Sequence, residues 1–279
     1  MIHVKPNIKT AGEGPTVVLL HSSGSSGRQW DMLVGALQSR FRLLTVDFHG
    51  HGSTPAWSGD RPLTLEDDAA LVAPLLAAAP GGAHIVGHSY GGAVALRLAQ
   101  KHPQLVNSVA VYEPVLFRLL FDYNARQPAA REVMLAAARI RTNLLVGRID
   151  RAAAHFVDYW SGAGTWDAMP LSRRQTVAAR MPSIVPHFAA LFSDTLRRSE
   201  LARLPMPVLC LTGARTKAST RRIGELLRLA MPSATHEMLA ALGHMGPVTH
   251  PGAVTARLAG WLDTQAMLRD AAERLLEAA

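Results

Sequence analysis

The sequence lacks the features of disulfide-rich, membrane-spanning and secreted proteins. Its single cysteine, Cys210, has no second cysteine in the chain to pair with, and such sparing use of cysteine is typical of a reducing compartment. No stretch of about 18 apolar residues runs without a charge, so we expect no membrane span. Residues 1–9 contain no apolar signal-peptide core. These absences together predict a cytoplasmic protein.

Acidic residues are fewer than basic residues. The chain has 29 Lys and Arg against 21 Asp and Glu, which gives a net charge of +8 at pH 7. A basic balance can indicate nucleic-acid binding, but here the arginines are scattered and no nucleic-acid-binding motif accompanies them. We therefore expect an arginine-rich, solvated surface and no nucleic-acid partner. No group of His, Cys and carboxylates has metal-ligand spacing, so we also expect no metal and no other cofactor.

Apolar strands that alternate with helical segments are the main feature present. The length of 279 residues and the 48% hydrophobic content suit one large α/β domain. The predicted strands are residues 2–8, 16–20, 42–47, 84–88, 108–113, 207–212 and 235–239. The predicted helices between and after them are residues 29–38, 65–79, 92–101, 220–230, 251–262 and 264–278. This alternation predicts a doubly wound, mostly parallel sheet.

The alternation stops in the middle of the chain. Residues 114–200 show helical periodicity only, with helix breaks predicted at Pro182 and Pro186. The simplest arrangement is a core of residues 1–113 and 201–279 that is interrupted by one helical insert, residues 114–200. Most aromatic side chains of the insert should form its own core, and a few should line a pocket for a small molecule with an apolar acyl or aryl part.

A pentapeptide in the first half of the chain carries the clearest chemical signal. Residues 87–91 read Gly-His-Ser-Tyr-Gly and lie between an apolar strand and a helix. This is the nucleophile-elbow pattern in its required setting. Ser89 would stand at the tip of a sharp turn with its hydroxyl exposed, and Gly87 and Gly91 would flank it because a Cβ there would collide with the neighbouring strand or helix.

With three further motifs in the same order, the chain resembles the α/β-hydrolase superfamily. The motifs are His-Ser-Ser-Gly at residues 21–24, Asp-x-His-Gly-x-Gly at residues 47–52 and Leu-Gly-His-Met at residues 242–245. The resemblance implies that Ser89 is a nucleophile and that His244 is its general base. It also implies that the insert is a cap over the active site. Asp47, by contrast, matches a family turn whose aspartate holds the loop through side-chain-to-backbone bonds.

The resemblance also implies an oxyanion hole made of two backbone N–H groups. One belongs to Tyr90, the residue after the nucleophile. The other belongs to Ser23, with Ser22 or Gly24 as the alternatives if the alignment is off by one residue.

The usual acidic member of the triad is absent from its usual place. Residues 213–222, which follow the strand that carries the acid in most of the family, contain no Asp or Glu, and Thr216 takes the aligned position. Some branches place the acid after the strand that follows the nucleophile, and Glu113 stands there. A charge at the end of an apolar strand is costly without a partner. We therefore predict a Ser89–His244–Glu113 triad, with an ion pair between Glu113 and a cap arginine, or a serine–histidine dyad, as alternatives.

The predicted activity is that of a cofactor-free serine hydrolase, which cleaves carboxylic esters through an acyl-enzyme. Hydrolysis of a carbon–carbon bond or of a lactone by the same triad is an alternative within this class. A ligand-binding sensor is an alternative of another class, and a pseudoenzyme is suggested by the acid missing after Gly213. The sequence indicates neither the substrate nor the oligomeric state.

Overall fold

A seven-stranded sheet lies at the centre of the computed structural model, which describes residues 4–277. Its strands stand in the order β1-β3-β2-β4-β5-β6-β7, and all neighbours run parallel except β1, which is antiparallel to β3. The strands are β1 (Ile8–Ala11), β2 (Thr16–Leu20), β3 (Arg42–Val46), β4 (Ala83–His88), β5 (Val106–Tyr112), β6 (Val208–Gly213) and β7 (Thr235–Leu239). The prediction of a doubly wound, mostly parallel sheet is confirmed.

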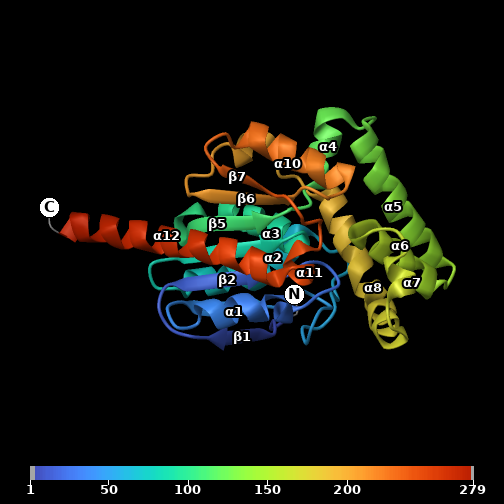
Figure 1. The fold of residues 1–279 in the computed structure, drawn as a ribbon, viewed down its shortest axis with the longest axis horizontal. Coiled ribbons are helices and arrows are strands. Elements are labelled where there is room, and N and C mark those ends of the chain that lie inside the picture. The colour runs from blue at the N-terminus through green and yellow to red at the C-terminus, as the bar shows by residue number, and fades with distance from the viewer. Residues whose placement is uncertain (1–3, 278–279) are drawn as a thin grey trace.

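Helices cover both faces of this sheet (Figure 1). One face packs against α1 (Asp31–Leu37) and α12 (Pro251–Glu277). The other face packs against α2 (Leu65–Ala77), α3 (Tyr90–Lys101) and α10 (Ala218–Ala230). The short elements η1 (Gly27–Trp30), η2 (Pro103–Leu105) and α11 (Gly246–Thr249) complete the core. Because both faces are covered, β2 and β4 are buried along their whole length, which explains the run of four apolar residues in β2.

Between β5 and β6 the chain forms helices only. They are α4 (Phe117–Asn124), α5 (Pro128–Leu145), α6 (Ile149–Ser161), α7 (Thr165–Ala168), α8 (Leu171–Ser193) and α9 (Arg198–Leu201). Helices α4 to α8 gather at one end of the sheet (Figure 1). The register places Leu20 beside Gly87 and His88 beside Tyr112, so the carboxyl ends of β2, β4 and β5 meet at one edge. Active sites of α/β proteins collect at such an edge.

Three sequence-based boundaries were wrong. Helix α8 continues through Pro182 and Pro186, where breaks were predicted. Each proline removes only its own N–H from the helical ladder, and the surrounding bonds and packing keep the helix together. The last two predicted helices form the single helix α12, and the first strand begins at Ile8, not at residue 2. Residues 1–3 and 278–279, which those predictions also included, lie outside the described residues.

None of the helices within residues 4–277 combines the length and the apolar character that crossing a membrane requires.

Candidate active site

The turn between β4 and α3 holds Ser89 in an unusual backbone conformation. Ser89 has φ of 55° and ψ of −114°. A Cβ on Gly87 would lie 2.4 Å from the carbonyl oxygen of Gly91, and one on Gly91 would lie 2.4 Å from that of Leu20. Only glycine allows β4, α3 and β2 to approach so closely, so the two glycines predicted to flank the turn are required by its packing.

Three buried side chains form a continuous hydrogen-bonded line at this edge of the sheet. Nε2 of His244 lies 2.9 Å from Oγ of Ser89, and Nδ1 lies 2.8 Å from Oε2 of Glu113. His244 comes from the loop between β7 and α11, and Glu113 directly follows β5. The exposed fractions of Ser89, His244 and Glu113 are only 5%, 2% and 2%. The structure thus brings together three residues that are up to 155 positions apart in the chain.

Glu113 is fixed by hydrogen bonds on both of its oxygens. Oε1 accepts from the Gly213 amide at 2.7 Å, and Oε2 accepts from the Thr216 hydroxyl at 2.7 Å and faces His244. The glycine and the threonine belong to the segment from which the usual acid is missing, and there they hold the carboxylate of another strand. No cap arginine is among the described partners of Glu113.

This arrangement defines the protonation of His244. A carboxylate only accepts hydrogen bonds, so Nδ1 carries the ring proton toward Glu113 and Nε2 presents its lone pair to the Ser89 hydroxyl. His88 holds the loop that carries His244, because its Nε2 donates to the main-chain carbonyl of His244 at 2.8 Å. A histidine held in this tautomer can take a proton from serine, and the nearby carboxylate stabilises the resulting imidazolium.

The backbone amides of Ser23 and Tyr90 donate to no partner among residues 4–277. The amides of Ser22 and Gly24 are engaged, by Gln29 Oε1 at 3.1 Å and by His51 Nε2 at 3.0 Å. The amide of Ser23 is therefore the unengaged donor of the three considered from sequence, and it belongs to a residue that lines the same cavity as Ser89. The second unengaged amide is that of Tyr90, the first residue of α3.

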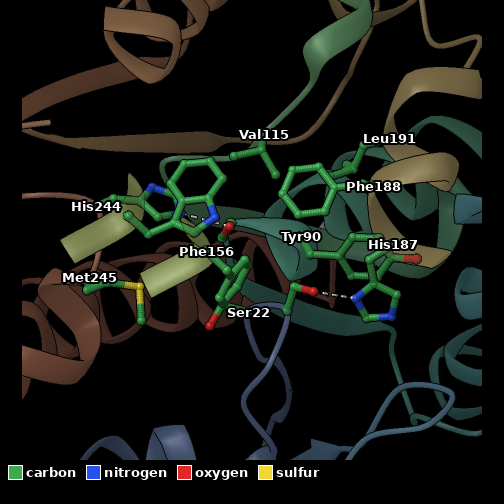
Figure 2. A pocket seen from close by; sticks show the side chains of 12 residues that line it. Ser22, Tyr90, Val115, Phe156, His187, Phe188, Leu191, His244 and Met245 are labelled. Carbon is green, nitrogen blue, oxygen red and sulfur yellow. Dashed lines mark hydrogen bonds between the residues drawn. The ribbon is translucent and has the colours of Figure 1, made fainter. Parts of the chain in front are cut away.

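A small, partly enclosed cavity lies beside Ser89 (Figure 2). Its volume is ≈ 20 Å³, enough for about one water molecule. The indole of Trp160 stacks on the His244 ring, with centroids 4.0 Å apart and planes 29° apart. The other apolar side chains that line the cavity are Val115, Phe156, Phe188, Leu191 and Met245. This space holds no molecule much larger than water, so a larger ligand requires the lining side chains to shift.

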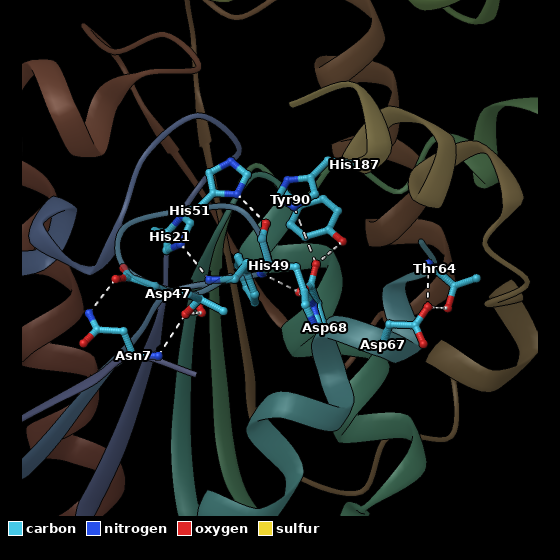
Figure 3. A network of polar contacts seen from close by, with 12 residues as sticks. Asn7, His21, Asp47, His49, His51, Thr64, Asp67, Asp68, Tyr90 and His187 are labelled. Atoms are coloured by element: carbon cyan, nitrogen blue, oxygen red, sulfur yellow. Dashed lines mark hydrogen bonds and ion pairs between the residues drawn. The ribbon is translucent and has the colours of Figure 1, made fainter. Parts of the chain in front are cut away.

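Sequence reasoning missed a buried polar network beside this cavity (Figure 3). At its centre is Asp68 of α2, which is fully buried. Its Oδ1 accepts from the His49 amide at 3.1 Å and lies 2.8 Å from His49 Nδ1, and its Oδ2 accepts from the Tyr90 hydroxyl at 2.7 Å. Burial, followed by the charge of Asp68, raises the pKa of Tyr90 well above its ordinary value. Tyr90 therefore remains a donor.

The role expected of Asp47 is confirmed. Its Oδ1 accepts from the Gly27 amide at 2.7 Å, and its Oδ2 accepts from the Asn7 side chain at 2.7 Å and from the Ser53 amide at 3.2 Å. It therefore ties three loops together at the end of β3. The single cysteine, Cys210, is buried in β6.

Comparison with known proteins assigns the family. Residues 17–258 match the profile of the alpha/beta hydrolase family. The chain therefore belongs to this family, and the sequence-based prediction of a hydrolase on this fold is confirmed.

The most similar relatives include two proteins named pimeloyl-(acyl-carrier protein) methyl ester esterase. The one from Methylococcus capsulatus is 31% identical over 264 residues, which cover 90% of this chain and 95% of the relative. The one from Chromobacterium violaceum is 28% identical over 260 residues, which cover 93% and 98%.

Solved structures agree with this assignment. A hydrolase from Pseudomonas aeruginosa superposes with a TM-score of 0.73 at 27% identity, covering 91% of this chain and 93% of that one. An enol-lactonase from Burkholderia xenovorans has the same TM-score at 24% identity, covering 92% and 96%, and it shows a shared fold.

Proposed function

We propose that this protein is a carboxylester hydrolase in which Ser89, His244 and Glu113 act as a catalytic triad. The observation that carries the proposal is the buried line of hydrogen bonds from Ser89 Oγ through the imidazole to the Glu113 carboxylate. The choice of ester as the substrate is supported by the relatives that are named methyl ester esterases.

In the first half of the reaction, the ester acylates the serine. His244 Nε2 takes the Ser89 proton as Oγ adds to the ester carbonyl carbon, and Glu113 stabilises the imidazolium. The carbonyl oxygen becomes an oxyanion that the amides of Ser23 and Tyr90 bind, the latter at the N-terminus of α3 where the helix dipole favours negative charge. When the carbon–oxygen bond to the alcohol breaks, the imidazolium gives its proton to the departing alkoxide.

In the second half, water releases the acyl group. His244 takes a proton from a water molecule while the water oxygen adds to the acyl carbon. The amides of Ser23 and Tyr90 bind the second oxyanion. Collapse of this intermediate breaks the bond to Ser89 Oγ, which receives the proton back from His244. The products are a carboxylic acid and free enzyme, and no cofactor takes part.

The helical insert, residues 114–200, serves as a cap in this proposal. Its Phe156, Trp160 and Phe188 line the cavity beside Ser89 and make it mostly apolar. We infer a small-molecule substrate whose acyl or aryl part is apolar and enters when the cap shifts. The methyl esters in the relatives' names favour an ester of a small alcohol.

The test combines a covalent probe with a substrate panel. A fluorophosphonate probe should label the wild-type protein and the control Ser172→Ala, whose serine is exposed on α8, but not Ser89→Ala. Methyl and p-nitrophenyl esters of increasing chain length should be hydrolysed, and activity should disappear in Ser89→Ala. A wild-type protein that takes no label would be a pseudoenzyme. Labelling without turnover of any ester would favour a sensor, or a hydrolase of lactones or carbon–carbon bonds.

A further inference from the structure

One face of helix α8 packs on the loop that supplies the Ser23 amide. This oxyanion loop is defined here as residues 22–24. Nη1 of Arg180 donates to the Gly24 carbonyl at 2.8 Å, and Cδ1 of Ile184 lies 3.0 Å from where a Gly24 Cβ would stand. Nδ1 of His187 lies 2.9 Å from the Ser23 hydroxyl. Residues spaced by four and then three positions share one side of a helix, so a single face of α8 contacts the loop at three points.

His187 is the innermost of these contacts. It is fully buried, and its ring stacks on Tyr90 with centroids 3.7 Å and planes 2° apart. Its other side stacks on His51 at 4.4 Å and 16°. His187 therefore touches both residues whose amides form the proposed oxyanion hole, Ser23 through the hydroxyl and Tyr90 through the ring (Figure 3).

The surroundings of His187 select one tautomer. Nε2 lies 3.6 Å from the carboxylate of the buried Asp68, so the ring proton belongs on Nε2. Nδ1 then accepts a hydrogen bond, and the Ser23 hydroxyl is its donor. Burial, followed by the repulsion of His51 and His21, holds the pKa of His187 well below its ordinary value. A neutral ring with a bare Nδ1 is the form that accepts a hydrogen bond from this hydroxyl.

A second histidine holds the loop from the core side. The Gly24 amide donates to His51 Nε2 at 3.0 Å, and His51 Nδ1 lies 2.9 Å from the His49 carbonyl, to which it donates. The Ser23 hydroxyl and the Gly24 amide are thus both committed to imidazoles. The backbone N–H of Ser23 is left as the donor of the loop that can bind a substrate oxygen.

We propose that His187 is a positioning residue for the oxyanion hole, and that seating of α8 therefore completes the hole when the cap closes. The proposal rests on the proposed function, because it assigns the Ser23 amide to the oxyanion. His187 does not touch the reacting atoms in this scheme. It acts by holding Ser23 and Tyr90 in one arrangement from the cap side.

The test compares two substitutions of His187. His187→Leu removes the acceptor and should lower kcat about 10- to 100-fold with KM within about twofold, somewhat less than the loss of a whole oxyanion donor. His187→Asn places its Oδ1 where Nδ1 stood and should restore most of kcat. His155→Asn changes an exposed cap histidine and should leave kcat unchanged. A trifluoromethyl ketone analogue of the best ester should bind more weakly to His187→Leu in proportion to the loss of kcat.

A double substitution separates positioning from general packing. Ser23→Ala keeps the backbone amide but removes the hydroxyl that His187 holds. If His187 acts through that hydroxyl, Ser23→Ala combined with His187→Leu should be no slower than His187→Leu alone. Losses in kcat that multiply would overturn the proposal, and so would a wild-type kcat in His187→Leu or an effect on KM alone.

Arg180 provides a second route if His187→Leu does not fold. Arg180 is exposed, so Arg180→Leu should fold while losing the bond to the Gly24 carbonyl, and it should lower kcat about threefold to tenfold. Arg180→Lys keeps a donor, and its kcat should lie between those of the wild type and Arg180→Leu. Equal activity of all three proteins would contradict the coupling of α8 to the loop. Failure of the proposed function appears separately, as ester hydrolysis that survives Ser89→Ala.

Discussion

Backbone strain in this protein is concentrated at two residues of the candidate site. Among residues 4–277, the non-glycine residues with positive φ are Ser89 at 55° and Glu113 at 44°. Each such conformation costs about 1–3 kcal/mol and persists only where the surrounding structure enforces it. The glycines around Ser89 made its strain predictable from sequence. The strain at Glu113 had no such signal, because the groups that hold its carboxylate, from Gly213, Thr216 and His244, are at least 100 positions away in the chain.

Glu113→Gln tests the least usual member of the proposed triad. The side-chain oxygen of the new glutamine can still accept from the Gly213 amide. The glutamine carries no charge to balance the imidazolium, and it can turn an N–H toward His244. We therefore expect kcat to fall about 10³- to 10⁴-fold. Circular dichroism and the unfolding midpoint should show an intact fold. Glu225→Gln makes the same change on the exposed face of α10 and should retain full activity. Near-wild-type ester hydrolysis by Glu113→Gln would instead support a serine–histidine dyad.

Trp160 offers a second prediction at the scale of one residue. Its indole stacks at 4.0 Å on the ring that becomes charged during the reaction, and a cation over an aromatic face gains about 0.5–2 kcal/mol. Trp160→Leu keeps an apolar cover but removes the aromatic face, and kcat should fall about threefold to thirtyfold. Trp160→Phe should retain most of the rate. Steady-state kinetics on one ester decide the matter, and equal rates for the two variants would exclude this contribution.

At the scale of elements, the sequence predicted local patterns well and distant contacts poorly. The turn before α3 was predictable because Gly87 and Gly91 mark it within five residues. The continuity of α8 was not predictable from sequence, because Pro182 and Pro186 are local break signals that tertiary packing overrides. The contact between His187 and Asp68 could not be predicted either, since the two residues belong to α8 and α2 and no sequence motif joins them.

A buried ion pair joins the end of α8 to α3, the helix that follows Ser89. Arg97 of α3 pairs with Asp194, and the two side chains are only 4% and 3% exposed. Asp194→Asn leaves the guanidinium buried without a counter-charge, which should lower the free energy of unfolding by about 3–5 kcal/mol. Urea denaturation measures the loss. Arg97→Met combined with Asp194→Leu removes both charges and should recover much of the stability. A change below about 1 kcal/mol in Asp194→Asn would mean that water reaches the pair.

At the scale of the whole molecule, histidine sets the response to acid. The chain has 12 histidines, and several are buried where water cannot solvate a charge. Burial is the first cause that lowers their pKa values, to about 3 for His21 and about 4 for His84. Burial likewise lowers the pKa values of His51, His88 and His187. Four of the five surround the candidate site, so the site and the stability of the fold depend on the same neutral rings.

The free energy of unfolding should therefore fall as the pH drops below about 6.5, the ordinary pKa of histidine. Below about pH 6.5 the unfolded chain binds more protons at these five rings than the folded chain does, so stability rises with pH up to that value and loses this dependence above it. Each ring contributes up to about 1.4 kcal/mol per pH unit. Urea midpoints measured from pH 4.5 to 8 give the slope. His84 lies on β4, away from the cavity, and its ring is bonded to Ser108. His84→Gln removes one titrating ring and should reduce the slope of stability against pH by the contribution of one proton. A flat profile below pH 6.5 would mean that these rings are protonated in the folded protein, and the hydrogen bonds that they accept from Ser23 and Gly24 would then be lost first.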